Sequence, residues 1–320
     1  MPSIRQFYER IDPKVNLEEL FPKISSEFKL GKYINWELIP YGYSDFNIKL
    51  QTKKDKYFVK IFSKFREKDE VEDIVNRFLM LNKNNIPAPK LYSKNDNYLY
   101  TFGKRNKSYL SVMEFIDGTD FTNISPSSYD IKKATEILAK INKLSFKIRK
   151  TYDSWGTKNL IPEFEKRKKY LTKEDLFLIN PIVDSFKQID FTDFRKSVIH
   201  GDLHGEHFFK DEEGKYWIID LETMDFAPSV IDLAIFLATF PLNKEYSLAF
   251  DKNIYRLVLT EYLTHIKLTV KEIRSIAKLI KATFAIYLVR ANYEKVVNND
   301  RGRQTEHWLK WARRGLKYEI

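Results

Sequence analysis

The chain has 320 residues, of which 43% are hydrophobic and 31% are charged, a composition that excludes a disordered or fibrous protein. It contains no cysteine, which excludes disulfides and thiolate zinc sites and fits a reducing compartment. The net charge is +11, and residues 251–320 carry 15 Lys and Arg against 7 Asp and Glu, which favours anionic partners. The N-terminal segment lacks the apolar core of a signal peptide, and no segment approaches the roughly 18–20 apolar residues of a spanning helix, so we expect a cytoplasmic protein.

The first third of the chain predicts a helical extension followed by a small antiparallel sheet. Residues 1–33 have a helical pattern, with Asn16 as a helix cap. Apolar and polar residues then alternate in three candidate strands and, after one charged amphipathic helix, in two more. The strands are expected at 34–41, 45–52, 56–62, 90–94 and 109–115, and the helix at 66–83.

Helical patterns dominate the remainder of the chain. The exception is the segment 198–222, which predicts a loop and a short hairpin. A sheet-rich first part joined to a helical second part indicates an α+β fold of two lobes with a cleft between them. The helices are expected at 130–149, 173–189, 229–240, 253–266, 271–299 and 304–317.

Two aspartates follow buried runs about twenty residues apart and could belong to one pocket. Asp202 lies in a His-Gly-Asp loop, where a carboxylate can accept the proton of a substrate hydroxyl. Asp220 follows an apolar strand, where a carboxylate is costly unless it is paired or binds a metal such as magnesium. Taken singly, Asp202 is more typical of a loop aspartate that caps a turn, and Asp220 is equally compatible with a turn-forming role.

Lys60 and three histidines offer further chemistry. Lys60 lies in an apolar strand on the same face as two phenylalanines, so it either points to solvent or binds an anion. The histidines at 200, 204 and 207 are spaced by four and three residues and offer an alternative, a zinc hydrolase. Gly201 and Gly205 argue against the helix that such a zinc site would need.

In this order, the segments resemble the aminoglycoside phosphotransferase and choline kinase-like family over residues 37–240. The resemblance implies the bilobal protein kinase-like fold, with a small antiparallel sheet and one main helix in the N-lobe and a larger helical C-lobe. It implies that Asp202 is the catalytic residue, that Asp220 binds the metal and that Asp232 braces the catalytic loop. His207 stands where the kinase pattern places asparagine, so its expected metal role relies on an imidazole, which is a poorer magnesium ligand.

The resemblance also assigns nucleotide contacts in the N-lobe. Lys60 matches the phosphate-holding lysine of the third strand, and the segment around Ser44 and Asp45 would lie near the phosphates. Glu114 and Ile116 match the hinge, whose backbone would meet the adenine edge.

Two positions in this comparison stay open or depart from the family. The glutamate that pairs with Lys60 is Glu67, Glu70 or Glu72, and Glu70 is favoured because Ile74 and Phe78 lie near its face. The helix before the catalytic loop often carries a histidine in this family, whereas this chain has Asn142.

The resemblance thus implies a helical extension (1–33), a nucleotide-binding N-lobe (34–116) and a C-lobe with the catalytic loop and acceptor site (117–320). The implied reaction is transfer of phosphate from ATP, with Mg2+, to a hydroxyl of a small molecule such as a sugar, an amino alcohol or a hydroxy amino acid. Three alternatives stay open: a kinase acting on an RNA or anionic glycolipid hydroxyl, a degenerate nucleotide-binding scaffold, and the zinc hydrolase. Trp308 and Trp311 in the basic C-terminal segment would suit RNA, but an amphipathic closing helix has the same pattern.

Overall fold

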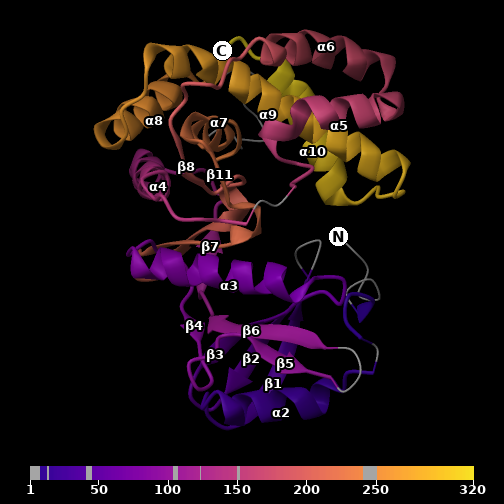
Figure 1. Cartoon of the computed structure of the whole chain (residues 1–320), viewed down its shortest axis with the longest axis vertical. Helices are drawn as coiled ribbons and strands as arrows, with labels where there is room; N and C mark the ends of the chain where they lie inside the picture. Colours follow the sequence, from indigo (N-terminus) through magenta and orange to yellow (C-terminus); the bar gives the residue numbers. More distant parts are fainter. Residues whose placement is uncertain are drawn as a thin grey trace. The chain divides into compact units, whose positions relative to one another are not determined.

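A computed structural model of the chain describes residues 8–12, 14–40, 45–103, 107–122, 124–149, 152–240 and 251–320. The chain forms two compact units, unit 1 (Met1–Gly118) and unit 2 (Thr119–Ile320), which are shown in Figure 1. Each unit has its own buried core and is described separately below.

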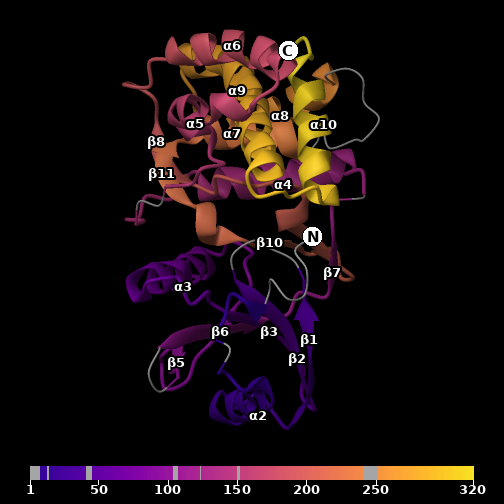
Figure 2. The same cartoon turned by 90° about the vertical axis from the view of Figure 1, so that its right-hand side faces the viewer.

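Unit 1 is built on a six-stranded antiparallel sheet, with the helices α2 (Leu17–Glu27) and α3 (Lys68–Lys83) on opposite sides (Figures 1 and 2). The strand order is β1-β2-β3-β6-β4, and β5 pairs with β6 beside β4. The strands are β1 (Tyr33–Ile39), β2 (Phe46–Thr52), β3 (Lys56–Ile61), β4 (Leu91–Tyr92), β5 (Tyr100–Phe102) and β6 (Ser108–Glu114).

Strict alternation in β2 and β3 separates the two faces of this sheet. Ile48 and Val59 have no exposed surface and pack in one core with Phe21 and Ile24 of α2, so α2 is part of the sheet's core. Lys60 lies between two buried residues of β3 and therefore points to the other face.

Helix α2 begins and ends for local reasons. Asn16 caps it as predicted, because its side chain accepts the backbone N–H of Glu18 at 3.1 Å. The helix does not extend over the whole of 1–33: it ends at Glu27, and Lys29 (φ 56°) and Gly31 (φ 105°) turn the chain toward β1.

Unit 2 is mainly helical. Helix α9 (Val270–Val296) is buried on most sides because it contacts α5, α6, α7 and α10, and Figure 2 shows it running among them. Every residue of α7 (Ser229–Thr239) is buried as well. The other helices are α4 (Ser128–Ile141), α5 (Leu160–Arg167), α6 (Lys173–Lys187), α8 (Lys252–His265) and α10 (Arg303–Leu316).

Short strands in unit 2 carry the polar segments that sequence analysis singled out. β8 (Lys196–Ile199) pairs with β11 (Asp225–Pro228), and a three-stranded sheet has the order β10-β9-β7. The strands of that sheet are β7 (Gly118–Asp120), β9 (Phe208–Asp211) and β10 (Tyr216–Ile218). The predicted loop and hairpin within 198–222 are therefore confirmed.

The predicted elements differ from the structure in a few places. Helix α4 ends at Ile141, eight residues before the predicted end, because Asn142 turns inward to make buried hydrogen bonds. Helix α5 was missed because Pro162 in its first turn looks like a helix breaker in the sequence. Among the described residues, no helix combines the length and apolarity needed to cross a bilayer.

Candidate active site

The loop after β8 is held by one buried carboxylate. Asp232, in the first turn of α7, has no exposed surface and accepts the backbone N–H groups of His200 and Gly201, both at 2.9 Å. Asn142 donates a third hydrogen bond to it at 2.8 Å and itself accepts the hydroxyl of Tyr262 at 2.8 Å. Burial raises the pKa of Asp232, although these donors favour the charged form. Asp232 therefore braces the loop, as the resemblance implied, and Asn142 takes part.

Gly201 is required where the loop turns. Its φ is +84°, and an added Cβ would lie 2.6 Å from the carbonyl oxygen of Thr223. The hydroxyl of Thr223 in turn donates to the carbonyl oxygen of His200 at 2.9 Å. This close approach ties the His-Gly-Asp loop to the turn that follows Asp220.

His200 connects the same two segments from the interior. It has no exposed surface; its Nε2 lies 3.1 Å from the carbonyl oxygen of Ile219, and its Nδ1 accepts the backbone N–H of Asp202 at 3.4 Å. Burial is the main reason that the pKa of His200 falls to about 3, so the ring is neutral. Both of its nitrogens are occupied by these contacts, and the ring is a structural support.

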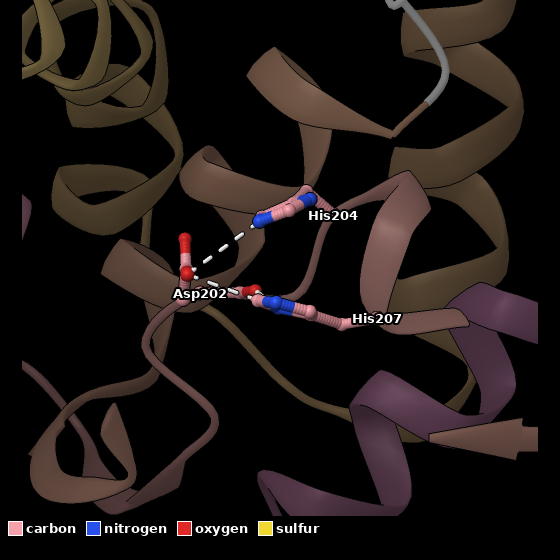
Figure 3. A group of neighbouring side chains, drawn as sticks. All are labelled: Asp202, His204 and His207. Atoms are coloured by element: carbon pink, nitrogen blue, oxygen red, sulfur yellow. Dashed lines mark hydrogen bonds and ion pairs between the residues drawn. The ribbon is translucent and has the colours of Figure 1, made fainter. Parts of the chain in front are cut away.

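Asp202 faces a set of proton donors. The hydroxyl of Tyr287 donates to Oδ1 at 2.6 Å, while His204 Nε2 and His207 Nδ1 lie 3.5 Å and 3.7 Å from Oδ2. Figure 3 shows both imidazole rings on one side of the carboxylate. Burial raises the pKa of Asp202, but His204, His207 and Tyr287 outweigh it and hold the pKa below its usual range. The carboxylate is therefore ionised at neutral pH, and 23% of its side chain is exposed.

His207 and Asp220, the two predicted metal residues, lie together at the end of the hairpin. His207 Nδ1 is 2.7 Å from the carbonyl oxygen of Asp202, and His207 Nε2 is 3.3 Å from Asp220 Oδ2. Asp220, two residues after the end of β10, adopts a left-handed conformation (φ 58°), a geometry seen at functional turns. One nitrogen and one carboxylate oxygen at this separation fit a divalent cation, whose bonds to such atoms are about 2.0–2.2 Å long.

A zinc site made of three histidines is not formed. Asp202, His204 and His207 each place a ligand atom within 4.8 Å of the others (Figure 3), but His200 is committed elsewhere. His204 Nδ1 accepts the backbone N–H of Glu206 at 3.3 Å, so its proton lies on Nε2, facing Asp202. Of the three rings, His207 is the one whose Nε2 faces Asp220.

In unit 1, Lys60 contacts a different carboxylate from the one favoured in the sequence. Lys60 Nζ lies 3.4 Å from Asp45 Oδ2, and Asp45 has 2% exposure. Arg66 donates to both oxygens of Asp45, at 2.8 Å and 3.1 Å, and also pairs with Glu70. Arg66 thus links Glu70 to Asp45. Lys60 is therefore a cation beside Asp45, a buried carboxylate that accepts several hydrogen bonds.

The remaining nucleotide residues of the sequence analysis lie in unit 1 as well. Glu114 is the last residue of β6, and its backbone N–H donates to Lys90 O at 2.8 Å. Ile116 follows in the segment between β6 and β7. Ser44 lies outside the described residues.

Sequence analysis did not connect Trp155 or Trp308 with the Asp202 loop, although both rings lie beside Tyr287. The rings of Trp155 and Trp308 lie 5.4 Å and 4.9 Å from the Tyr287 ring, centroid to centroid. Burial and the charges of Asp202, Asp153 and Glu206 raise the pKa of Tyr287 well above its usual value, so the hydroxyl remains a neutral donor. No local motif marks these positions, because fold contacts bring them together from four separate segments.

Asp153 differs from Asp202 in that its pKa is raised. Burial, together with the negative charge of Asp202, raises its pKa to about 6. Its Oδ1 accepts the backbone N–H of Trp155 at 2.9 Å, which fixes its orientation. Lys158 also pairs with Asp225 and Arg290 with Glu294, but the charges of both cations still lower the pKa of Asp153. Three carboxylates, Asp153, Asp202 and Glu206, act on the Tyr287 hydroxyl.

The C-terminal helix α10 is an amphipathic closing helix. Trp308 and Trp311 are only 7% and 3% exposed and pack against Tyr287. Arg313 forms a double hydrogen bond with the buried Asp175, at 2.8 Å and 2.9 Å. The two rings are not available to stack on bases, so the alternative of an RNA-binding tail finds no support here.

Comparison of the sequence with known protein families identifies the family of this chain. The sequence profile described as "Phosphotransferase enzyme family" matches residues 35–262, which is most of the chain. The chain belongs to this family. The predicted family and the enzyme class, a kinase-type phosphotransferase, are thereby confirmed. None of the curated proteins matches the sequence.

Solved structures with the same fold include three kinases of small molecules. The choline kinase LicA from Streptococcus pneumoniae has a TM-score of 0.64 and 17% identity, covering 94% of this chain and 98% of its own. The amicoumacin kinase hAmiN, solved with AMP-PNP and Ca2+, has a TM-score of 0.70 and 12% identity, covering 95% and 94%. A spectinomycin phosphotransferase, solved with ADP and spectinomycin, has a TM-score of 0.67 and 12% identity, covering 95% and 98%. These similarities confirm the predicted kinase-like fold class.

Proposed function

We propose that the protein is an ATP-dependent kinase that phosphorylates the hydroxyl group of a small molecule carrying an amine. The observation that carries this proposal is the state of Asp202, a carboxylate that is ionised, oriented by Tyr287 and partly exposed. Such a group can accept the proton of an acceptor hydroxyl as its oxygen bonds to the terminal phosphorus. The bond between that phosphorus and the bridging oxygen breaks, and ADP leaves.

On this proposal the residues of unit 1 hold the nucleotide. Lys60 would bind phosphate oxygens, with Asp45 rather than Glu70 keeping its side chain in position. Ser44 would lie near the phosphates, and the backbones of Glu114 and Ile116 would meet the adenine. The AMP-PNP and Ca2+ complex of the similar amicoumacin kinase supports a nucleotide and a divalent cation as cofactors.

His207 Nε2 and Asp220 Oδ2 are the atoms that would hold the cation, for which we expect Mg2+ or a metal that replaces it. Their separation of 3.3 Å supports this assignment. When bound, the cation would neutralise charge on the phosphates. The chain's own part is to keep both ligands fixed: the backbone N–H of Ile219 donates to His207 O at 3.0 Å and locks their positions together.

The proposed amine on the acceptor follows from the charge around Tyr287. Asp153 and Glu206 add two carboxylates whose charges act on Tyr287 together with that of Asp202. The guanidinium of Arg290 already lies over the ring of Trp155, 5.3 Å from its centroid, so the carboxylates, which bind ammonium groups well, support the amine. Of the acceptors considered from the sequence, an amino alcohol combines the hydroxyl and the cation most simply.

The test is transfer of labelled terminal phosphate from ATP to a panel of amino alcohols, hydroxy amino acids, sugars, RNA and lipid. We expect transfer to an amine-bearing acceptor and none with the Asp202→Ala variant, which should still bind nucleotide. Substantial turnover by that variant would overturn the role of Asp202. ATP turnover restricted to RNA or lipid would overturn the proposed acceptor, and nucleotide binding without any transfer would favour the scaffold alternative.

A further inference from the structure

The N-terminal segment of unit 1 packs against the start of β2. Ile11 is 4% exposed and lies in the core that α2 shares with the sheet. The ring of Tyr8 meets the ring of Phe46, the first residue of β2, edge to face with centroids 5.2 Å apart. Arg10 lies between these two anchors in the sequence, so its backbone is held on both sides.

Arg10 bonds to two stretches of chain that meet near Lys60. Its Nη1 donates to the carbonyl oxygen of Asp45 at 2.7 Å, and its own carbonyl oxygen accepts the backbone N–H of Lys64 at 2.9 Å. Asp45 precedes β2 and contacts Lys60, while Lys64 lies two residues before Arg66. Arg10 therefore ties together the segment that carries the partner of Lys60 and the segment that carries Arg66.

Three cations and two carboxylates make up the group around Asp45. Lys60 and Arg66, each with 12% of the side chain exposed, contact Asp45, and Arg66 also pairs with Glu70. These four charges cancel, so the charge of Arg10 makes the group positive. Burial lowers the pKa of Arg10 while the charge of Asp45 raises it, and a guanidinium stays protonated in proteins. A positive group with so little exposure attracts anions with weak screening by salt.

On the basis of the proposed function, which assigns phosphate binding to Lys60, we propose that Arg10 is a further positioning residue for the phosphates of the nucleotide. It holds the backbone of Asp45, whose carboxylate orients Lys60 and Arg66, and it supplies the charge that the group would otherwise lack. The match to the phosphotransferase family begins only at residue 35. The segment around Arg10 therefore belongs to the nucleotide-binding part of this chain and not to a separate extension.

A role at the phosphates has a consequence that a purely structural role does not have. Loss of Arg10 should weaken the binding of ATP and spare that of adenosine, because adenosine carries no charge for the group to attract. Loss of a packing contact that only supports unit 1 would weaken both ligands alike. The ratio of the affinities for ATP and adenosine therefore separates the two roles.

The experiment is equilibrium dialysis of the full-length protein against a labelled methylene-bridged ATP analogue or labelled adenosine. Divalent cations are left out, so that the candidate metal residues do not contribute. Arg10→Gln keeps an N–H donor and removes the charge, and we expect it to lower the ratio of the two affinities by about tenfold or more, the size of one charge-assisted hydrogen bond. Arg10→Lys keeps the charge and should hold the ratio within about threefold of the wild type.

Lys14→Gln is the matched control, because it removes the same charge from an exposed position of the same segment. It should leave the ratio unchanged. An unchanged ratio in Arg10→Gln overturns the proposal, and so does an equal fall in both affinities, or a fall in Lys14→Gln or Arg10→Lys as large as in Arg10→Gln. A wild type that does not prefer the ATP analogue to adenosine overturns the nucleotide role of Lys60 together with this inference, whereas a wild-type preference that survives in Arg10→Gln overturns this inference alone.

Discussion

Tyr287→Phe removes one hydroxyl and with it a single hydrogen bond to the candidate catalytic carboxylate. The bond from Tyr287 to Asp202 Oδ1 is short, at 2.6 Å, and its acceptor is ionised. Hydrogen bonds to charged groups contribute about 1.5–3 kcal/mol. Since 23% of the Asp202 side chain is exposed and water can replace part of the bond, we expect a loss of about 1.5 kcal/mol in the free energy of unfolding.

The pH dependence of this loss has a definite sign. The pKa of Asp202 is below its usual range in the folded protein, so the stabilisation is fully present above the unfolded pKa of about 3.9. It disappears as the pH falls through the folded pKa. The difference between wild type and Tyr287→Phe should therefore be constant from pH 8 to about pH 5 and shrink below pH 4.

Urea unfolding followed by tryptophan fluorescence is the appropriate assay, because four of the five tryptophans, all except Trp36, lie in unit 2 with Tyr287 and Asp202. In an Asp202→Ala background the same substitution should change stability by less than about 0.5 kcal/mol. Tyr262→Phe is the matched control, because its hydroxyl bonds to the neutral Asn142. A coupling energy between Tyr287 and Asp202 below about 0.5 kcal/mol would refute the reasoning.

Three other substitutions test the support of the site, each by urea unfolding of the full chain. Asp232→Ala leaves two buried backbone N–H groups without an acceptor and should cost about 3–5 kcal/mol; a loss below about 1 kcal/mol contradicts the bracing role. Asp153→Asn should stabilise the protein by up to about 3 kcal/mol at pH 8 and not at all below about pH 4. Burial raises the pKa of Asp153 to about 6, so its charge opposes folding increasingly as the pH rises from about 3.9 to about 6. Equal effects at pH 8 and pH 4 would contradict this reasoning. Gly201→Ala should cost more than Gly214→Ala, since both have positive φ but only the first Cβ meets a backbone oxygen, at 2.6 Å; equal losses contradict the close approach.

The residues of the candidate site that could be predicted lie close together in the sequence. Asp202, His207 and Asp220 lie within a stretch of nineteen residues. Each is close to an apolar run, whose burial fixes the backbone position of the residue. The hairpin β9–β10 then brings Asp220 back to His207, which requires only local pairing of Phe208 with Ile218. A sequence pattern captures such contacts because few arrangements of the backbone are compatible with it.

The residues that could not be predicted reach the site through tertiary packing. Tyr287 is 85 residues from Asp202 and lies on a helix buried on most sides, so its sequence pattern looks like any core helix. The contact of Lys60 with Asp45, the residue before β2, was also beyond the sequence, because the sequence analysis considered only glutamates on the following helix. Asn142 likewise acts through a buried bond to Asp232, ninety residues away.

The most direct test of the central claim compares Asp202→Asn with the wild type in transfer of labelled phosphate from ATP to an amino alcohol. Asparagine keeps the size of the side chain and an oxygen that accepts the hydrogen bond of Tyr287. It cannot take the proton from the hydroxyl of the amino alcohol. We predict that nucleotide affinity stays within about twofold while kcat falls by at least about 100-fold, the range typical of losing a general base. Transfer at near wild-type rate by Asp202→Asn would contradict the account.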